Sequence, residues 1–318
     1  MKRKQSLKLG ISSCLLGNNV RYDGGHKFDR YLCNTLGQFV EWVPICPEAA
    51  CGLSIPREAM HLAGDPDSPR LMTRETGIDH TKRTMQFAEN RLAELVQENL
   101  CGFVFKARSP SCGVRDTKLS SRSGRIKSKR AGLFAEAVMR RFPLMPVADE
   151  EEMRDSGTRE NFLERVFVYV RWQELIAQGG TISQLIAFHM AHKYVLMSHS
   201  PKHLKELGAL VADSKTCKRA ELLERYGQAL MHCLKQKATI RKQVNVLRQI
   251  SGYFTHHLLP AEKIELQGAI AGYLQGLIPL IVPIALLNHY VRKYDDPCLK
   301  QQHYLNPHPL ELMLRNHA

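Results

Sequence analysis

Three apolar segments in the first 112 residues each lead into a turn that carries a cysteine. The segments are 7–13, 39–45 and 101–105, and they are followed by Cys14, Cys46 and Cys112. Short apolar runs that alternate with longer helix-like stretches predict the parallel strands of an α/β sheet. Because open α/β sheets bind ligands beyond the carboxyl ends of their strands, we expect the three thiols to converge at that edge.

The turn at 106–113 (KARSPSCG) carries the most pronounced local chemistry. Serine, proline and glycine end the preceding strand. Lys106 and Arg108 stand close to Cys112, and neighbouring cations favour the thiolate, the form of cysteine that binds metal or attacks an electrophile.

The spacing of the three cysteines narrows the choice of metal. They are separated by 32 and 66 residues, whereas structural zinc sites use close pairs such as C-x-x-C. Three thiolates can instead hold an iron–sulfur cluster with one iron left open. The residues alone leave a second interpretation, in which the three cysteines are simply small buried side chains.

Two domains are expected. Residues 1–155 alternate strand-like and helix-like patterns, which predicts a Rossmann-like open parallel sheet with helices at 28–38, 79–98 and 131–141, a loop or hairpin at 61–77 and a last strand at 144–148. Residues 156–318 lack a convincing strand and predict a separate all-α domain. Its expected helices lie at 158–178, 182–199, 201–212, 216–236, 238–252 and 260–292. Aromatic residues there are expected mainly in the core, and its histidines and cysteines are not expected to bind metal.

The formal net charge of +14 favours an anionic partner, either nucleic acid or a membrane surface. The most apolar segment, 274–287, is too short to span a bilayer and contains two prolines. Nine cysteines in a chain without an evident export signal indicate a reducing compartment. We therefore expect a cytoplasmic protein with no membrane contact and no obligatory protein partner.

A basic segment directly follows the Cys112 turn. Cations recur over residues 114–130 without apolar periodicity, which predicts a loop. The loop is either merely solvated or grips phosphates at the mouth of the same site. The candidate RNA-binding residues of this region are Lys106, Arg108, Arg115, Arg122, Arg125, Lys127, Lys129 and Arg130.

These motifs together resemble a known family. Residues 11–17 (ISSCLLG), 20–24 (VRYDG), 46–48 (CPE), 52–53 (GL), 56–57 (PR) and 106–113 look like the thiouracil desulfidase family. Tyr273 and residues 277–283 (LIPLIVP) resemble the YbgA-like helical domain. The combination is similar to the RudS-type tRNA 4-thiouridine desulfidases.

The resemblance implies a 4Fe–4S cluster held by Cys14, Cys46 and Cys112, with one open iron for the substrate sulfur. It makes Glu48 the acid–base carboxylate and places the Ser109 hydroxyl near the thiocarbonyl. A structural role is also open to Glu48, because a carboxylate after a proline suits the start of a helix. Cys51 departs from the pattern as a competing second ligand, although it lies out in the loop whereas Cys46 directly ends a strand.

The expected reaction is hydrolytic: 4-thiouridine in tRNA becomes uridine, and sulfide is released. Glu48 would take a proton from the attacking water. The alternatives are a desulfidase of free thiouracil or thiolated nucleosides, and a non-catalytic iron–sulfur protein that binds nucleic acid. A base within folded RNA must be exposed or flipped out, so the basic helical domain is expected to dock the tRNA.

Overall fold

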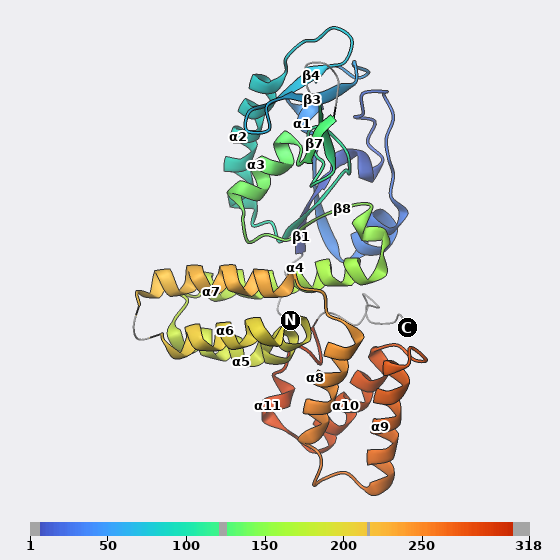
Figure 1. Ribbon diagram of the computed structural model, residues 1–318, viewed down its shortest axis with the longest axis vertical. Helices are drawn as coiled ribbons and strands as arrows, with labels where there is room; N and C mark the ends of the chain where they lie inside the picture. The colour runs from blue at the N-terminus through green and yellow to red at the C-terminus, as the bar shows by residue number, and fades with distance from the viewer. Residues whose placement is uncertain (1–6, 121–125, 215–216, 308–318) are drawn as a thin grey trace. The chain divides into compact units, whose positions relative to one another are not determined.

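The computed structural model describes residues 7–120, 126–214 and 217–307, and it divides the chain into two compact units, 1–162 and 163–318 (Figure 1). The sequence predicted the division at 155/156. The division in the structure instead lies within the long helix α4 (Ser156–Ala177).

The first unit contains a four-stranded parallel sheet, and the chain is α/β here and helical in the second unit, as predicted. The strands are β1 (Leu7–Ser12), β2 (Val40–Ile45), β5 (Gly102–Phe105) and β8 (Val147–Asp149), in the order β2-β1-β5-β8. The order reverses at β1, which has β2 on one side and β5 on the other. Such a reversal is where open α/β sheets place their ligand crevice.

Strand register brings the carboxyl ends of β1, β2 and β5 level with one another. Ser12 pairs with Ile45, and Ile11 pairs with Val104. The segments that follow these three strands therefore begin at one edge of the sheet, which is the arrangement that the alternating sequence pattern predicted.

The core of this sheet requires a glycine on β1. All four residues of β5 are buried, as expected for a central parallel strand. The Phe103 ring stacks on Phe105 with centroids 4.0 Å apart. A Cβ on Gly10 would lie 2.2 Å from that Phe103 ring, so only glycine lets the ring pack flat against β1.

A second, mixed sheet lies in the same unit, and it corrects the prediction that 114–130 is a loop. Its strands, β3 (Met60–Gly64), β4 (Pro69–Thr73), β6 (Thr117–Ser120) and β7 (Ile126–Arg130), run in the order β4-β3-β6-β7. The antiparallel pair β3–β4 is the hairpin allowed for within 61–77. In β6, Thr117 and Leu119 are buried and Lys118 is exposed, a short period-two pattern that the surrounding cations conceal.

Helices and tight turns complete the first unit. The predicted helix at 28–38 is instead a π-helical turn followed by a 3₁₀ turn, whereas the predictions at 79–98 and 131–141 correspond to regular helices. The elements are η1 (Ser13–Leu16), η2 (Tyr31–Thr35), η3 (Leu36–Gln38), α1 (Pro47–Ala50), α2 (Thr81–Glu98), α3 (Leu133–Arg141) and η4 (Glu152–Arg154).

The second unit is helical throughout its described part. After α4 come α5 (Ile182–His199), α6 (Pro201–Ala212), α7 (Arg219–Leu234), α8 (Ile240–Gly252), α9 (Pro260–Leu274), α10 (Ile281–Lys293) and α11 (Pro297–Lys300). The single helix predicted at 260–292 is wrong, because the chain breaks between α9 and α10. Gly276 adopts a φ of 74° in that break, and Pro279 follows it, so neither residue favours continuing the helix.

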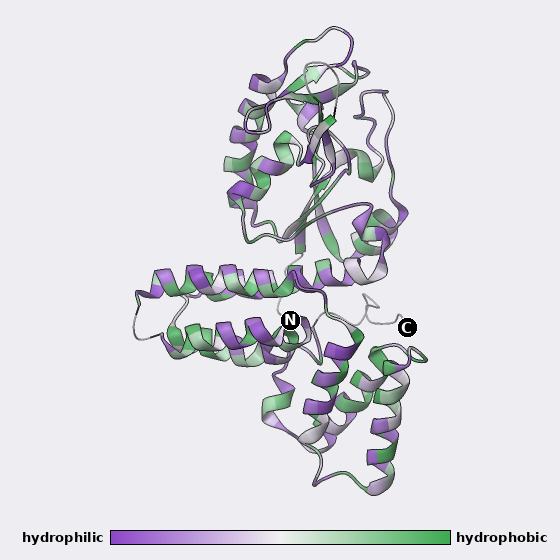
Figure 2. Cartoon of the chain, viewed as in Figure 1, coloured by the Kyte–Doolittle hydropathy of each residue, from purple (hydrophilic) through white to green (hydrophobic). Residues whose placement is uncertain are grey.

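Aromatic side chains build the core of the helical unit. The Trp172 ring lies 5.6 Å from Phe188 and 5.5 Å from Tyr226, measured between centroids. Tyr253, by contrast, is 47% exposed. Hydrophobic and hydrophilic residues alternate along α7, as one buried and one exposed face require (Figure 2). Among the described residues, no helix combines the length and hydropathy needed to cross a bilayer.

Candidate functional site

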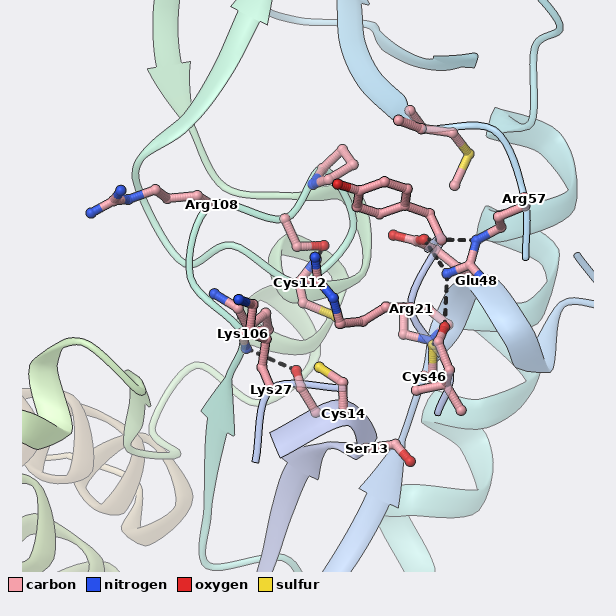
Figure 3. Close-up of a pocket in the computed structure, with 18 of the residues that line it drawn as sticks. Ser13, Cys14, Arg21, Lys27, Cys46, Glu48, Arg57, Lys106, Arg108 and Cys112 are labelled. Atoms are coloured by element: carbon pink, nitrogen blue, oxygen red, sulfur yellow. Dashed lines mark hydrogen bonds and ion pairs between the residues drawn. The ribbon is translucent and has the colours of Figure 1, made fainter. Parts of the chain in front are cut away.

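A cavity of about 330 Å³ lies at the carboxyl edge of the parallel sheet. Cys14, Cys46 and Cys112 line it together with Glu48 and Ser109, so the structure brings all five predicted site residues to one place (Figure 3). They reach it from three separate strand ends, as the level register of the strands requires.

The first two cysteines sit within one or two residues of their strands. Cys14 lies in η1, directly after β1, and its carbonyl accepts the N–H of Lys27 at 2.9 Å. Cys46 separates β2 from α1, and its thiol faces the carbonyl of Val20 at 3.7 Å. Both backbones are therefore fixed by the sheet and by neighbouring loops.

The third cysteine is held by a turn that docks on the start of α3. The carbonyl of Pro110 accepts the N–H of Leu133, and the carbonyl of Ser111 accepts the next two N–H groups of the helix. The turn thus satisfies helix donors that would otherwise lack partners. A Cβ on Gly132 would lie 2.6–2.7 Å from the backbone of this turn, so the close approach depends on glycine.

Ser109 braces the same turn and keeps its proton for another partner. Its hydroxyl oxygen accepts the N–H of Ser111 at 3.2 Å and the N–H of Cys112 at 3.1 Å. These two bonds occupy both lone pairs of the oxygen. Ser109 can therefore act on a molecule in the cavity only as a hydrogen-bond donor.

Glu48 is held at both of its oxygens. Arg57 donates to Oε2 from Nη2 at 2.6 Å and from Nε at 3.1 Å, and the Ser111 hydroxyl donates to Oε1 at 2.9 Å. The exposed fractions of the two side chains are 7% for Arg57 and 13% for Glu48. Arg57 and Ser111 were not predicted as site residues, although both lie within the motifs that indicated the family.

Burial controls the ionisation of the three thiols. It raises the pKa of Cys14 to about 11, with a further increase from the neighbouring Cys46 thiol, against smaller decreases from Lys106 and Arg21. Burial is also the main cause that raises the pKa of Cys46, and that of Cys112 to well above its ordinary value. The expectation that Lys106 and Arg108 make Cys112 a thiolate is therefore wrong, because desolvation outweighs the nearby cations. Arg108 extends away from the thiols (Figure 3).

The donor set fits an iron–sulfur cluster better than a single ion. Among the described residues, no three His, Cys, Asp or Glu side chains are grouped closely enough to hold one metal ion. The three thiols nevertheless lie close enough to raise one another's pKa, and they surround a cavity with room between them. A metal centre would supply the positive charge that their deprotonation needs.

Cys51 does not line the cavity. Its thiol faces the carbonyl of Glu48 at 3.2 Å, within its own loop. The geometry therefore places Cys46, and not Cys51, beside the other two thiols.

Most of the candidate RNA-binding cations have carboxylate partners. Lys106 pairs with the buried Glu150, whose other oxygen accepts the N–H of Ala107 at 2.6 Å. The other pairs are Arg108–Glu151, Arg115–Glu152, Lys129–Asp116 and Arg130–Glu136. Arg122 and Arg125 lie outside the described residues, and so does the side chain of Lys127. Glu150 was missed by the sequence analysis and carries no motif signal of its own.

Comparison with known proteins divides the chain in the same way. A family model described as 2-thiouracil desulfurase matches residues 9–150, and one described as a protein of unknown function, DUF1722, matches residues 193–309.

Two curated relatives match different parts of the chain. The Escherichia coli (strain K12) protein described as uncharacterized protein YbgA is 30% identical over 158 residues, which are 49% of this chain and 94% of the relative. The Bacillus subtilis (strain 168) protein described as uncharacterized protein YbbK is 32% identical over 108 residues, which are 32% of this chain and 71% of the relative. A solved structure described as the 4Fe–4S-dependent thiouracil desulfidase TudS is 30% identical and covers 47% of this chain and 94% of its own, with a TM-score of 0.38.

Proposed function

We propose that this chain, which belongs to the 2-thiouracil desulfurase family over residues 9–150 and carries a YbgA-like DUF1722 domain, is an iron–sulfur-dependent desulfidase that converts 4-thiouridine in tRNA to uridine. One observation carries the proposal: three thiols, a carboxylate and a hydroxyl donor from separate elements line one cavity. Cys14, Cys46 and Cys112 would hold the cluster. A cluster with one iron free of protein ligands supplies a soft Lewis acid that binds and polarises a thiocarbonyl sulfur.

Glu48 is placed to handle the water proton. Its Oε2 is committed to Arg57, whereas Oε1 accepts one bond from Ser111 and keeps a lone pair that faces the cavity side. A water bound there can transfer a proton to the carboxylate while its oxygen attacks the carbon that bears sulfur. The overall change replaces C=S by C=O, consumes one water and releases hydrogen sulfide, so no net electron transfer is required.

Ser109 complements this role from the opposite side of the reaction. Because its hydroxyl can only donate, it can stabilise negative charge that develops on the ring nitrogen or on the leaving sulfur. Glu48 as proton acceptor and Ser109 as donor together match the demands of a hydrolysis in which water loses a proton and the base gains one.

The tRNA substrate is supported by charge and by the second domain. The chain carries 45 Lys and Arg against 31 Asp and Glu, a balance suited to a polyanion. A free base would need only the cavity. The appended helical unit gives a reason for a larger substrate, and we propose that it contacts the tRNA body.

The test is an assay under nitrogen with thiolated tRNA and, in parallel, free thiouracil. We expect loss of the near-ultraviolet absorbance of 4-thiouridine with matching sulfide release from tRNA. Cys14→Ala, Cys46→Ala and Cys112→Ala should abolish both signals and lower the bound iron. Cys51→Ala is the matched control and should retain both.

Two results would change the conclusion. Turnover of thiouracil without turnover of tRNA would favour the free-base reaction and leave the helical unit with another role. Sulfide release from neither substrate, by protein that contains its full iron complement, would refute the desulfidase activity itself.

A further inference from the structure

The charges that line the cavity are strongly unbalanced. Six cationic side chains and one carboxylate line it: Arg21, Lys27, Arg57, Arg74, Lys106, Arg108 and Glu48. Four of the cations are paired: Arg21 with Asp23, Arg57 with Glu48, Lys106 with Glu150 and Arg108 with Glu151. A neutral pyrimidine base does not require the two cations that remain.

Those two cations are Lys27 and Arg74. Both are exposed, and neither forms a side-chain hydrogen bond or ion pair with any residue in the described part of the chain. They come from different elements: Lys27 follows the β1 turn, and Arg74 directly follows β4. Two unpaired cations that converge on one cavity from separate elements form an anion site.

Their backbones are anchored, so the two charges are held at the cavity wall. The N–H of Lys27 donates to the carbonyl of Cys14 at 2.9 Å, and the N–H of Arg74 donates to the carbonyl of Ala59 at 3.0 Å. Only the side chains are free to adjust to a ligand.

Compensation of the thiols does not account for this pair. The cations that lower the pKa of Cys14 are Lys106 and Arg21, and the one that lowers the pKa of Cys46 is Arg57. Glu58, the carboxylate on the same hairpin as Arg74, is committed elsewhere, because it accepts bonds from the N–H groups of Glu75 and Thr76 and from the Thr76 hydroxyl.

An aromatic surface lies in the same cavity. Tyr22 lines it and is 43% exposed. The Arg21 guanidinium lies 5.3 Å from the centroid of its ring. An exposed ring of this kind can stack on a base, which leaves the attached phosphate for the cations around the cavity.

We infer that Lys27 and Arg74 form a phosphate subsite, so that the unit recognised by the cavity is a nucleotide and not a base or nucleoside. This inference rests on the proposed function for the identity of the base, and it names the substrate class within it. Lys27 and Arg74 contact the phosphate beside the target base, and the base lies inward, toward Cys112 and Glu48.

The experiment is equilibrium binding of uridine 5′-monophosphate to the full-length protein, prepared under nitrogen with its iron content measured. This ligand contains no sulfur, so it binds without reacting, and uridine is the reference without phosphate. Lys27→Gln and Arg74→Gln should each weaken monophosphate binding about tenfold, as expected for loss of a charge-assisted hydrogen bond. Binding of uridine should change less than twofold.

Arg108→Gln is the matched control, because Arg108 is an exposed cation of the same cavity that already has a partner, Glu151. Its replacement should leave both affinities within twofold. Thermal melting of each variant checks that it folds.

The subsite is refuted if the intact protein binds the monophosphate no more tightly than uridine, or if Arg108→Gln weakens binding as much as the other two changes. These binding results do not depend on catalysis. A protein that shows the expected pattern but desulfurates no thiolated substrate keeps the subsite and loses the proposed function, and the reverse pattern separates them equally.

Discussion

Replacement of Arg57 by methionine tests how strongly the candidate site depends on its buried ion pair. Arg57 donates two hydrogen bonds to Glu48 and others to the carbonyls of Val20 and Ser54. In R57M, the 13%-exposed Glu48 carboxylate would lose its counter-charge. Removing one partner of a buried pair costs about 3–5 kcal/mol, because the remaining charge is left unsolvated. We expect the first unit to lose that much of its free energy of unfolding.

Hydrogen exchange of the β5 amides measures this quantity within the first unit alone. The matched comparison is a double-mutant cycle with E48Q. If the pair accounts for the loss, E48Q/R57M should be more stable than the sum of the two single changes predicts by at least about 1 kcal/mol. A loss below about 1 kcal/mol in R57M, or strict additivity in the cycle, would refute the claim that the pair holds Glu48 in place.

Three further changes probe other parts of the molecule. Ser109→Ala removes the acceptor of two backbone N–H groups and the hydroxyl donor, so unfolding free energy should fall by about 1–2 kcal/mol and kcat by about 10²-fold or more; unchanged kcat would exclude the donor role. Gly132→Ala places a Cβ against the Cys112 turn and should lower the iron content of purified protein, whereas Gly268→Ala, whose Cβ meets nothing within 4 Å, should not. Burial, reinforced by Arg171, lowers the pKa of His303 to about 4, so this histidine is neutral in the folded state. Its contribution to stability is complete above about pH 6.5 and is lost as pH falls toward 4. His303→Gln should therefore flatten the acid slope of urea midpoints followed by Trp172 fluorescence, with the other tryptophan replaced by phenylalanine.

The sequence predicted those parts of the fold that have a strong repeating pattern. The parallel strands and α2 follow from apolar runs and helical spacing, and the common edge for Cys14, Cys46 and Cys112 follows from parallel topology alone. The hairpin at β6 and β7 was missed because the buried pattern spans only Thr117 and Leu119, among residues whose charges dominate the segment. A two-residue signal of this kind is decided by tertiary packing.

The site shows the same division between local and non-local information. Ser109 and Cys112 could be placed by their turn, but the partners of Glu48 could not, because Ser111 is 63 positions away in sequence. The ionisation of the thiols was predicted with the wrong direction for a similar reason. Sequence proximity to Lys106 is visible in the chain, whereas burial, which outweighs it at Cys14, depends on the complete fold.

The ion pairs also change what the net charge of +14 means for recognition. Counting cations places the strongest positive field on the segment after Cys112, yet Arg115, Lys129 and Arg130 each have a carboxylate partner. Exposed pairs of this kind contribute little net field at a distance. Lys27 and Arg74 are only two charges, but they are unpaired and lie at the cavity. Recognition of a phosphate is therefore expected to depend on these two residues more than on the longer basic segment, and the salt dependence of tRNA binding should fall by about one unit of logarithmic slope for each of them that is neutralised.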